Sequence, residues 1–160
     1  MDGRFIVSEI SQYVVARIQE ELFALNIRYV QEILKQPDIT KVPTKVPYLL
    51  GLIKLRNQAV PLINVRKKFY NTDELVHSPV VIIIQDAHLN KLVGLLVDEV
   101  EEIASIPSDS IDHPILFSGR DGEESVSGVA NLNSGLVIIL NDEKLFSDLD
   151  YKAFETITKP

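Results

Sequence analysis

The stretch Gly51-Leu-Ile-Lys-Leu-Arg-Asn-Gln-Ala-Val-Pro-Leu-Ile-Asn-Val-Arg66 has apolar residues in both halves and a polar centre. This pattern predicts two short strands joined by a tight turn, because Asn is among the residues that tolerate a left-handed backbone. Side chains alternate between the two faces of a strand, so we expect Ile53 to point away from the face that carries Lys54 and Arg56. Arg56 then lies exposed at the hairpin tip, either as a solvated turn charge or as a contact for a partner.

The composition indicates an acidic globular chain of 160 residues, organised as one domain or as two small lobes that share a core. Apolar residues make up 46% of it, yet no apolar run approaches the roughly 18 residues needed to span a bilayer. A net charge of -7 disfavours nucleic acid and anionic lipid as partners. The absence of cysteine excludes disulfides, thiol catalysis and thiolate metal sites. No signal-peptide segment follows the first residues, so we expect a cytoplasmic protein without direct membrane insertion.

The hydrophobic patterns along the chain are mostly those of short strands. Val80–Ile84 is apolar on both faces, which predicts a strand covered on both sides. The segment 28–34 is compatible with a helical turn or with a strand, and 107–127 is predicted to be a long connector anchored by 115–117. Asn141 is predicted to begin a terminal helix that runs to about residue 148. The other predicted strands are 13–19, 22–27, 39–42, 51–55, 58–65, 91–97, 128–132 and 136–140, and a helical turn is predicted at 66–69.

The predicted domain organisation has four parts. Residues 1–10 are a flexible N-terminal arm, 11–148 form a single domain, and 149–160 are a C-terminal tail. The polar segment 71–79 is the predicted internal boundary.

Two blocks of the first half of the chain recur, in the same order, in the second half. The segment 24–33 aligns with 94–103 at an offset of 70, and 51–69 aligns with 128–146 at an offset of 77. Duplicated sets of about five short strands are typical of small barrels, and each half is marginal in size for folding alone. We therefore predict an all-β protein of two five-stranded barrels, with short helical turns and a C-terminal helix.

No catalytic constellation is present in the sequence. The three histidines lack the spacing of metal ligands, and neither a phosphate-binding glycine loop nor a nucleophile elbow occurs. The acids of 98–102 could form a carboxylate or cation site, although the exposed face of a strand explains them more simply. We therefore expect no enzyme, no cofactor and no metal, and protein recognition becomes the leading class of function.

Several ordered motifs between Tyr13 and Phe146 resemble those of the CheW family, the scaffold proteins of bacterial chemotaxis. They are Phe23-Ala-Leu-Asn-Ile27, Val30-Gln-Glu-Ile33, Ile39-Thr-Lys-Val-Pro43, Pro47-Tyr-Leu-Leu-Gly-Leu-Ile-Lys-Leu-Arg56, Val60-Pro-Leu-Ile-Asn-Val-Arg66, Val93-Gly-Leu-Leu-Val-Asp-Glu-Val100 and Leu136-Val-Ile-Ile-Leu140.

The resemblance implies two SH3-like barrels and an adaptor without catalysis. Such an adaptor joins the CheA histidine kinase to the cytoplasmic tip of methyl-accepting chemotaxis receptors. One barrel docks on the CheW-like regulatory domain of the kinase, and the groove between the barrels holds a receptor helix. An alternative within the same fold is a CheW-like adaptor of a non-flagellar pathway, such as one that serves gliding, pili or gene regulation.

The resemblance also implies partner-facing residues, each of which has a structural alternative. Val30 and Ile33 could instead be core residues, and Glu32 could be a solvated strand residue. Gly51 could serve only a backbone bend. Arg56 is the strongest candidate because packing does not require an arginine at a hairpin tip.

Three residues depart from the usual family pattern. Asn57 stands where glycine is usual, and we predict the same left-handed turn there. Lys54 replaces a frequent asparagine beside Arg56, and Asn64 replaces a frequent aspartate that caps the next turn. Lys54 and Asn57 therefore join the predicted partner site, while the specificity for partners and the oligomeric state stay open.

Overall fold

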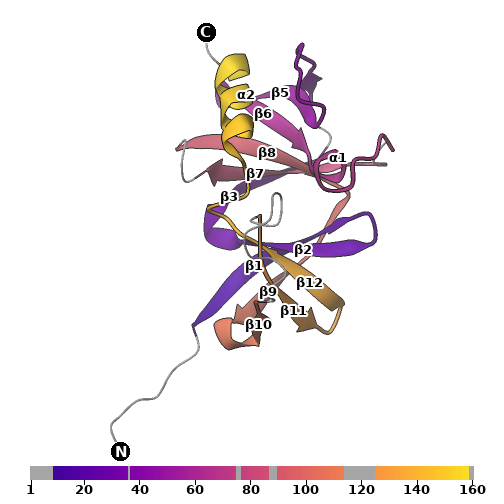
Figure 1. The fold of residues 1–160 in the computed structure, drawn as a ribbon, viewed down its shortest axis with the longest axis vertical. Coiled ribbons are helices and arrows are strands. Elements are labelled where there is room, and N and C mark those ends of the chain that lie inside the picture. The colour runs from indigo at the N-terminus through magenta and orange to yellow at the C-terminus, as the bar shows by residue number, and fades with distance from the viewer. Residues whose placement is uncertain (1–8, 36, 75–76, 87–89, 114–124, 159–160) are drawn as a thin grey trace, which may run out of the picture.

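The computed structural model of the chain describes residues 9–35, 37–74, 77–86, 90–113 and 125–158. Most of these residues lie in strands, as predicted (Figure 1). The helices are α1 (Val65–Tyr70) and α2 (Asp148–Thr158), with short 3-10 turns η1 (Ile27–Tyr29) and η2 (Ser108–Ser110). The strands are β1 (Ile10–Ile18), β2 (Glu21–Asn26), β3 (Val30–Lys35), β4 (Ile39–Thr40), β5 (Leu49–Leu55), β6 (Gln58–Asn64), β7 (Val80–Asp86), β8 (Lys91–Val97), β9 (Glu99–Pro107), β10 (Ile111–Asp112), β11 (Val126–Leu132) and β12 (Gly135–Leu140).

The strands form two six-stranded sheets, one in each lobe of the molecule. The order in the lower lobe of Figure 1 is β10-β11-β12-β2-β1-β9, and the order in the upper lobe is β3-β7-β8-β6-β5-β4. The long strands of each lobe number five, and the two-residue strands β4 and β10 each add a sixth at one edge. This arrangement confirms the all-β class and is compatible with SH3-like barrels.

The two repeats of the chain exchange hairpins with each other. The first repeat runs from β1 to β6, but its hairpin β1–β2 pairs with strands of the second repeat in the lower lobe. The hairpin β7–β8 of the second repeat pairs in turn with β3 and β6 of the first. The repeated blocks 24–33 and 94–103 are the two crossovers between lobes, since each joins an exchanged hairpin to the next strand.

The register of the pairing follows the repeat residue by residue. In the upper lobe Leu62 lies opposite Gly94, and in the lower lobe Ile139 lies opposite Ala24, which are the positions aligned at offsets of 77 and 70. The β-bulges recur as well, at 49–51 in β5 and at 126–128 in β11. The two sequence repeats therefore have equivalent structures, and each is completed by a hairpin from the other repeat.

The central core lies between the two lobes and is built from strands that are buried on both faces. In β7, Ile82 and Ile84 face this central cluster, whereas Val81 and Ile83 face the interior of the upper lobe. The hairpin β1–β2 behaves in the same way and gives Val14 to the central cluster. The prediction that Val80–Ile84 is covered on both sides is confirmed.

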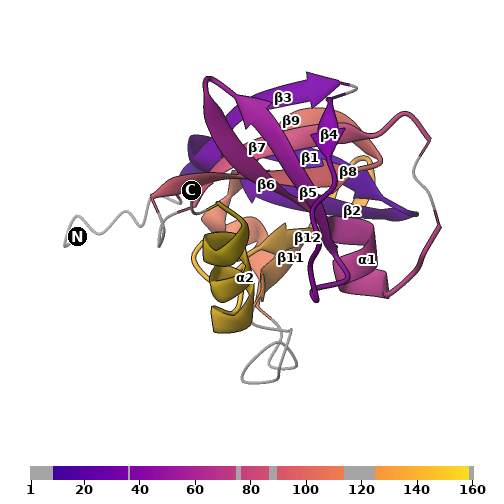
Figure 2. The same cartoon turned by 90° about the horizontal axis from the view of Figure 1, so that it is seen from above.

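Helix α2 follows β12, a strand of the lower lobe, in the sequence, but it packs against the upper lobe (Figures 1 and 2). Phe154 is buried and meets Phe146 edge to face at 5.1 Å between ring centroids. The Tyr151 hydroxyl donates a hydrogen bond of 3.0 Å to Oδ1 of Asp86 in β7. Asp150 is fully buried and pairs with Nζ of Lys68 at 2.9 Å, and burial raises the pKa of this carboxyl. Helix α2 therefore holds residues 148–158 against the upper lobe.

Three predictions of organisation need correction. The segment 71–79 joins the two repeats but does not separate the lobes, because β7 and β8 return to the sheet of β3–β6. The residues 149–160 are not a plain tail, because α2 occupies most of them.

The third correction concerns the helix predicted at 141–148. The side chain of Asn141 caps only a turn, through the N–H of Glu143. The helix starts later, where Ser147 and Asp150 exchange backbone-to-side-chain hydrogen bonds in a capping box.

The long connector predicted for 107–127 contains η2, β10 and the start of β11, and its anchor at 115–117 lies outside the described residues. The arm at 1–10 lies outside them too, except for Glu9 and Ile10. Neither helix in the described part of the chain has the length and apolar run needed to cross a bilayer.

The exchange of hairpins predicts that neither half of the chain folds alone. We expect the separate fragments 1–78 and 79–160 to lack a cooperative thermal transition, since each lobe needs strands from both. Mixing the fragments is expected to restore the near-native circular dichroism and a single transition. A fragment that unfolds cooperatively by itself would contradict the dependence of each lobe on the other repeat.

Candidate partner-binding surface

The turn between β5 and β6 has the geometry that the sequence predicted. Arg56 has a φ of 50° and Asn57 a φ of 65°, between the paired residues Leu55 and Gln58. Two consecutive positive φ angles in a two-residue loop define a type I′ turn, which matches the twist of the flanking strands. The predicted left-handed conformation of Asn57 is confirmed. Arg56 adopts the same conformation at a cost of about 1 kcal/mol, because its Cβ crowds the backbone there.

Arg56 at this tip forms an ion pair with Glu32 of β3. The Arg56 Nη2 and Glu32 Oε2 atoms are 3.0 Å apart, and the side chains are 63% and 32% exposed. β3 lies at one edge of the upper sheet, away from β5 and β6 in the strand order, so the pair bridges elements that do not share backbone hydrogen bonds. An exposed pair of this kind contributes at most about 1 kcal/mol to stability. Its main effect is to hold two charged side chains in one orientation at the surface.

The apolar candidates of β3 divide between the core and the surface. Val30 is partly buried and packs against the central cluster. Ile33 is 40% exposed, although its backbone pairs with that of Ile82 in β7. Of the two, Ile33 is therefore the residue available to a partner.

Gly51 and Lys54 have different roles in β5. Gly51 is buried beneath β4, and a Cβ there would collide with the backbone carbonyl of Thr40. Its counterpart Gly128 meets the carbonyl of Asp112 in the same way, so this glycine serves the close approach of two strands. Lys54 is exposed and forms no ion pair with any residue that the structure describes.

Two of the acids of 98–102 form structural ion pairs. Asp98 Oδ2 lies 2.5 Å from Nη2 of Arg66 in α1 and accepts the backbone N–H of Gln19 at 2.9 Å. Glu101 pairs with Arg17 in the lower lobe. Arg66 and Asp98 thus tie α1 to the β1–β2 turn across the boundary between the lobes.

Comparison with known proteins identifies the family. A family model described as "CheW-like domain" matches residues 12–150, which is most of the chain. The chain belongs to the CheW-like domain family.

Curated relatives and a solved structure agree with this membership. The "Chemotaxis protein CheW" of Treponema pallidum is 27% identical over 143 residues, covering 85% of this chain and 82% of that protein. The protein of the same name from Helicobacter pylori is 29% identical over 137 residues, covering 86% and 82%. The crystal structure of the scaffolding protein TtCheW from Thermoanaerobacter tengcongensis superposes with a TM-score of 0.77 at 31% identity, covering 87% of this chain and 94% of that one.

The CheW-like fold also exposes a residue that the sequence analysis did not select. Ile103 in β9 is 58% exposed, and it is the repeat counterpart of Ile33. The alignment of 24–33 with 94–103 ends on this pair, so the sequence contained the signal. The two lobes therefore present an exposed isoleucine at equivalent positions.

A partly buried acid near the crossover makes the stability of this CheW-like domain depend on pH. Burial raises the pKa of Asp142 from 3.8 to about 6, and the backbone N–H of Asn26 and the charge of Arg28 offset only part of this rise. The folded state thus binds this proton more tightly than the unfolded chain. The stabilisation is fully present below pH 4 and is lost as the pH rises to about 6.

We expect Asp142→Asn to remove this loss, because the amide has no charge to bury. The variant is expected to be more stable than the parent at pH 7 by about 1 kcal/mol, after allowance for partial exposure, and to gain little below pH 4. Urea unfolding at pH 4 and pH 7 measures the difference. Asp38→Asn, at an exposed site, is the matched control, and an equal gain from both variants would rule out burial of Asp142 as the cause.

Proposed function

We propose that this protein is a non-catalytic adaptor that couples methyl-accepting chemotaxis receptors to a CheA-type histidine kinase. Membership of the CheW-like domain family supports this role, as do relatives named chemotaxis protein CheW and a structural neighbour described as a scaffolding protein. In this role the protein works in the cytoplasm and reaches the membrane only through its receptors.

The proposed contact surface is centred on the pair formed by Arg56 and Glu32, the single observation that carries its placement. Both side chains of the pair are accessible. Ile33 follows Glu32 directly and is exposed on the other face of β3, because successive strand residues point to opposite sides. Since β3 is an edge strand, a partner at that edge can reach both faces and combine an apolar anchor with a charged rim. Lys54 and Asn57 extend the proposed surface along the hairpin, while Val30 packs on the central cluster and Gly51 lies against β4.

The mechanism that we propose is rigid transmission between two bound partners. The kinase regulatory domain docks on one lobe, and a receptor helix lies in the groove between the lobes. The exchanged hairpins and the central cluster join the lobes into one packed unit, so a displacement at one contact reaches the other without a hinge.

A second candidate is a CheW-like adaptor of a non-flagellar pathway. The departures at Lys54 and Asn57 favour it, because they alter the charge and the turn residue beside Arg56 while the turn geometry is retained. The two candidates share the fold and differ in the kinase and receptors that bind.

Arg56→Ala and Glu32→Ala are expected to weaken capture of the kinase regulatory domain or of the receptor tip by about tenfold or more, as for truncation of an interface hot spot. The fold should be unchanged, since the exposed pair contributes little to stability. Pull-down and titration with each purified partner, together with thermal unfolding of each variant, measure both quantities.

Asn133→Ala provides the matched control. Asn133 occupies the repeat counterpart of Arg56 in the turn between β11 and β12, where the positive φ falls on Gly135 instead. This variant is expected to keep full binding. Absence of binding by the intact protein to any chemotaxis-type kinase or receptor tip would refute the proposed function.

A further inference from the structure

A groove of about 440 Å³ opens in the upper lobe, where the β5–β6 turn and the adjoining ends of β7 and β8 approach α2. Its volume falls within the range of ligand clefts, about 300–1,000 Å³. Buried side chains of Pro61, Val93 and Phe154 contribute to its lining. Its lining includes Arg56 at one turn and Glu155 on α2, so it reaches beyond the contact surface described above.

The polar lining consists mostly of amides and cations. Gln31, Gln58 and Asn90 are exposed within it, and an amide offers both a donor and an acceptor, although Asn90 Oδ1 already accepts from Nε2 of Gln85 at 3.0 Å. The Lys91 side chain is exposed and forms neither a hydrogen bond nor an ion pair with any described residue. Among the described lining residues Glu155 supplies the one carboxylate.

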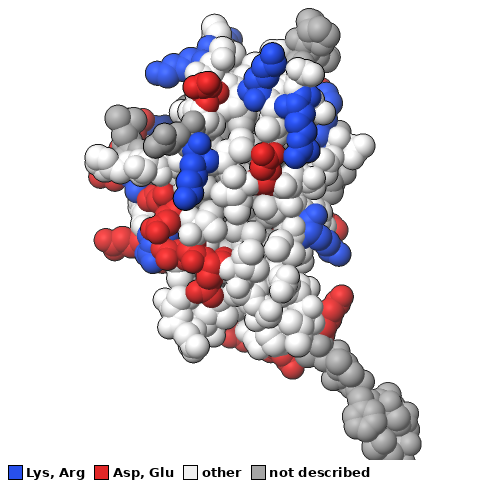
Figure 3. Space-filling view, turned by 180° about the vertical axis from the view of Figure 1, so that it is seen from behind, with Lys and Arg blue, Asp and Glu red and all other residues white. Residues whose placement is uncertain are grey.

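The upper lobe carries a small excess of positive charge. Lys and Arg still outnumber Asp and Glu there when α2 is counted with the described part of 30–97, although the whole chain has a net charge of -7. On the face shown in Figure 3, Lys and Arg lie mostly on the upper part and acids mostly lower down. A second hollow, beside the β1–β2 turn, contrasts with the groove, because Glu20, Glu21 and Glu74 surround Arg66 there. The groove therefore has more cations than acids in its described lining, whereas the second hollow has more acids than cations.

We infer that the groove between Arg56, Lys91 and α2 is a docking site for an extended, acidic polypeptide segment of a protein partner. The amides of Gln31, Gln58 and Asn90 are suited to pair with the N–H and C=O groups of an extended backbone, whose polar groups need partners when they leave water. Lys91 then attracts carboxylates of the segment. Arg56 does so in competition with its ion-pair partner Glu32, and Glu155 opposes both cations. The site goes beyond the proposed adaptor function, because its test needs neither the kinase nor the receptor.

The probe for this inference is a short synthetic peptide of alternating Glu and Ser, added at low salt to the isotope-labelled full-length protein. We expect amide chemical-shift changes at Asn90, Lys91 and Glu155, with a dissociation constant in the micromolar to millimolar range. A peptide in which Gln replaces every Glu should bind at least about tenfold more weakly, because it lacks the charge that the cations attract.

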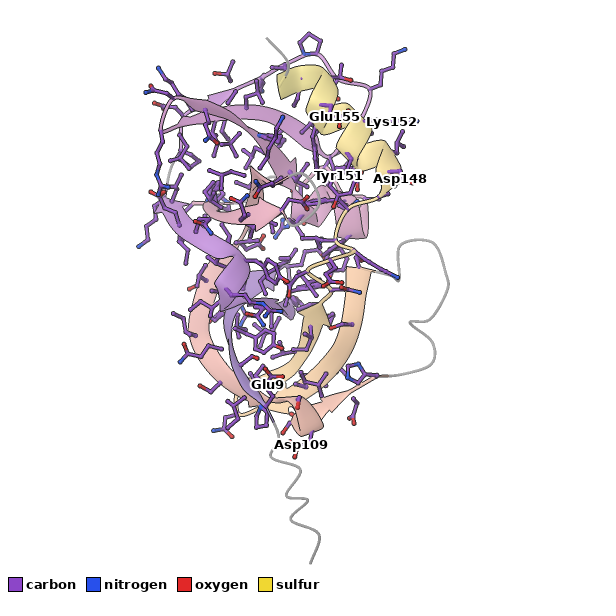
Figure 4. All side chains as sticks on the ribbon, turned by 90° about the vertical axis from the view of Figure 1, so that its left-hand side faces the viewer. Glu9, Asp109, Asp148, Tyr151, Lys152 and Glu155 are labelled. Carbon is purple, nitrogen blue, oxygen red and sulfur yellow. The ribbon has the colours of Figure 1, made fainter. Side chains whose placement is uncertain are left out.

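Two substitutions with opposite expected effects make the test specific. Lys91→Glu should weaken binding of the Glu peptide about tenfold, and Glu155→Gln should strengthen it severalfold. Lys152 lies one helical turn from Glu155 on α2 (Figure 4), so the matched control is Lys144→Glu, which makes the same charge change at an exposed residue that does not line the groove. At about 0.15 M salt, where charges beyond about 8 Å are screened, it should change binding less than about twofold.

Equal binding of the Glu and Gln peptides would overturn the inference, and so would shift changes confined to the lower lobe or no binding at millimolar peptide. The proposed adaptor function is tested separately by capture of the kinase and receptor. Failure of the peptide experiment alone would leave that function standing.

Discussion

The structure depends on apolar packing between the two sheets, in a cluster that strands of both repeats build together. β7 and the hairpin β1–β2 are buried on both faces, so each contributes at once to a lobe and to the cluster between lobes. Truncating a side chain such as Ile82 would leave a cavity at this junction and cost about 2–5 kcal/mol. The same packing positions the proposed partner surface at the β5–β6 turn. Both strands of that hairpin contribute to the central cluster, β5 through Leu49 and β6 through Ile63.

Much of the fold could be predicted from local pattern. The 51–66 stretch predicts its hairpin because apolar alternation and a turn-forming Asn agree, and Val80–Ile84 predicts two-sided burial because it has no polar face. The repeat predicts which segments are alike, but not which strands pair, because resemblance between segments carries no information about exchange. The terminal helix was predicted too early in the chain, although Tyr151, Phe154 and Ile157 recur at helical spacing, since Asn141 offered an earlier and more obvious cap.

The sequence identifies individual residues of the candidate site, but it does not predict which of them lie together. Arg56 stands out at a turn, yet its pairing with Glu32 depends on how β3 closes against the hairpin, and the two lie on elements that are not paired in the sheet. The groove beside it was beyond sequence reasoning, because its lining comes from β3, β6, β7, β8 and α2. The curated relatives and the solved structure support the family, and the family supports the proposed adaptor role. The residues that we propose to choose among partners are those in which this chain departs from the family pattern.

The exchanged hairpins also set the order in which the protein can fold as it is synthesised. The hairpin β1–β2 leaves the ribosome first, but its neighbours β9 and β12 are made only in the second half of the chain. Until then its two apolar faces have no native cover, and long-range pairings of this kind fold slowly. The hairpin therefore remains without its native neighbours, and prone to aggregation, until β12 has been synthesised.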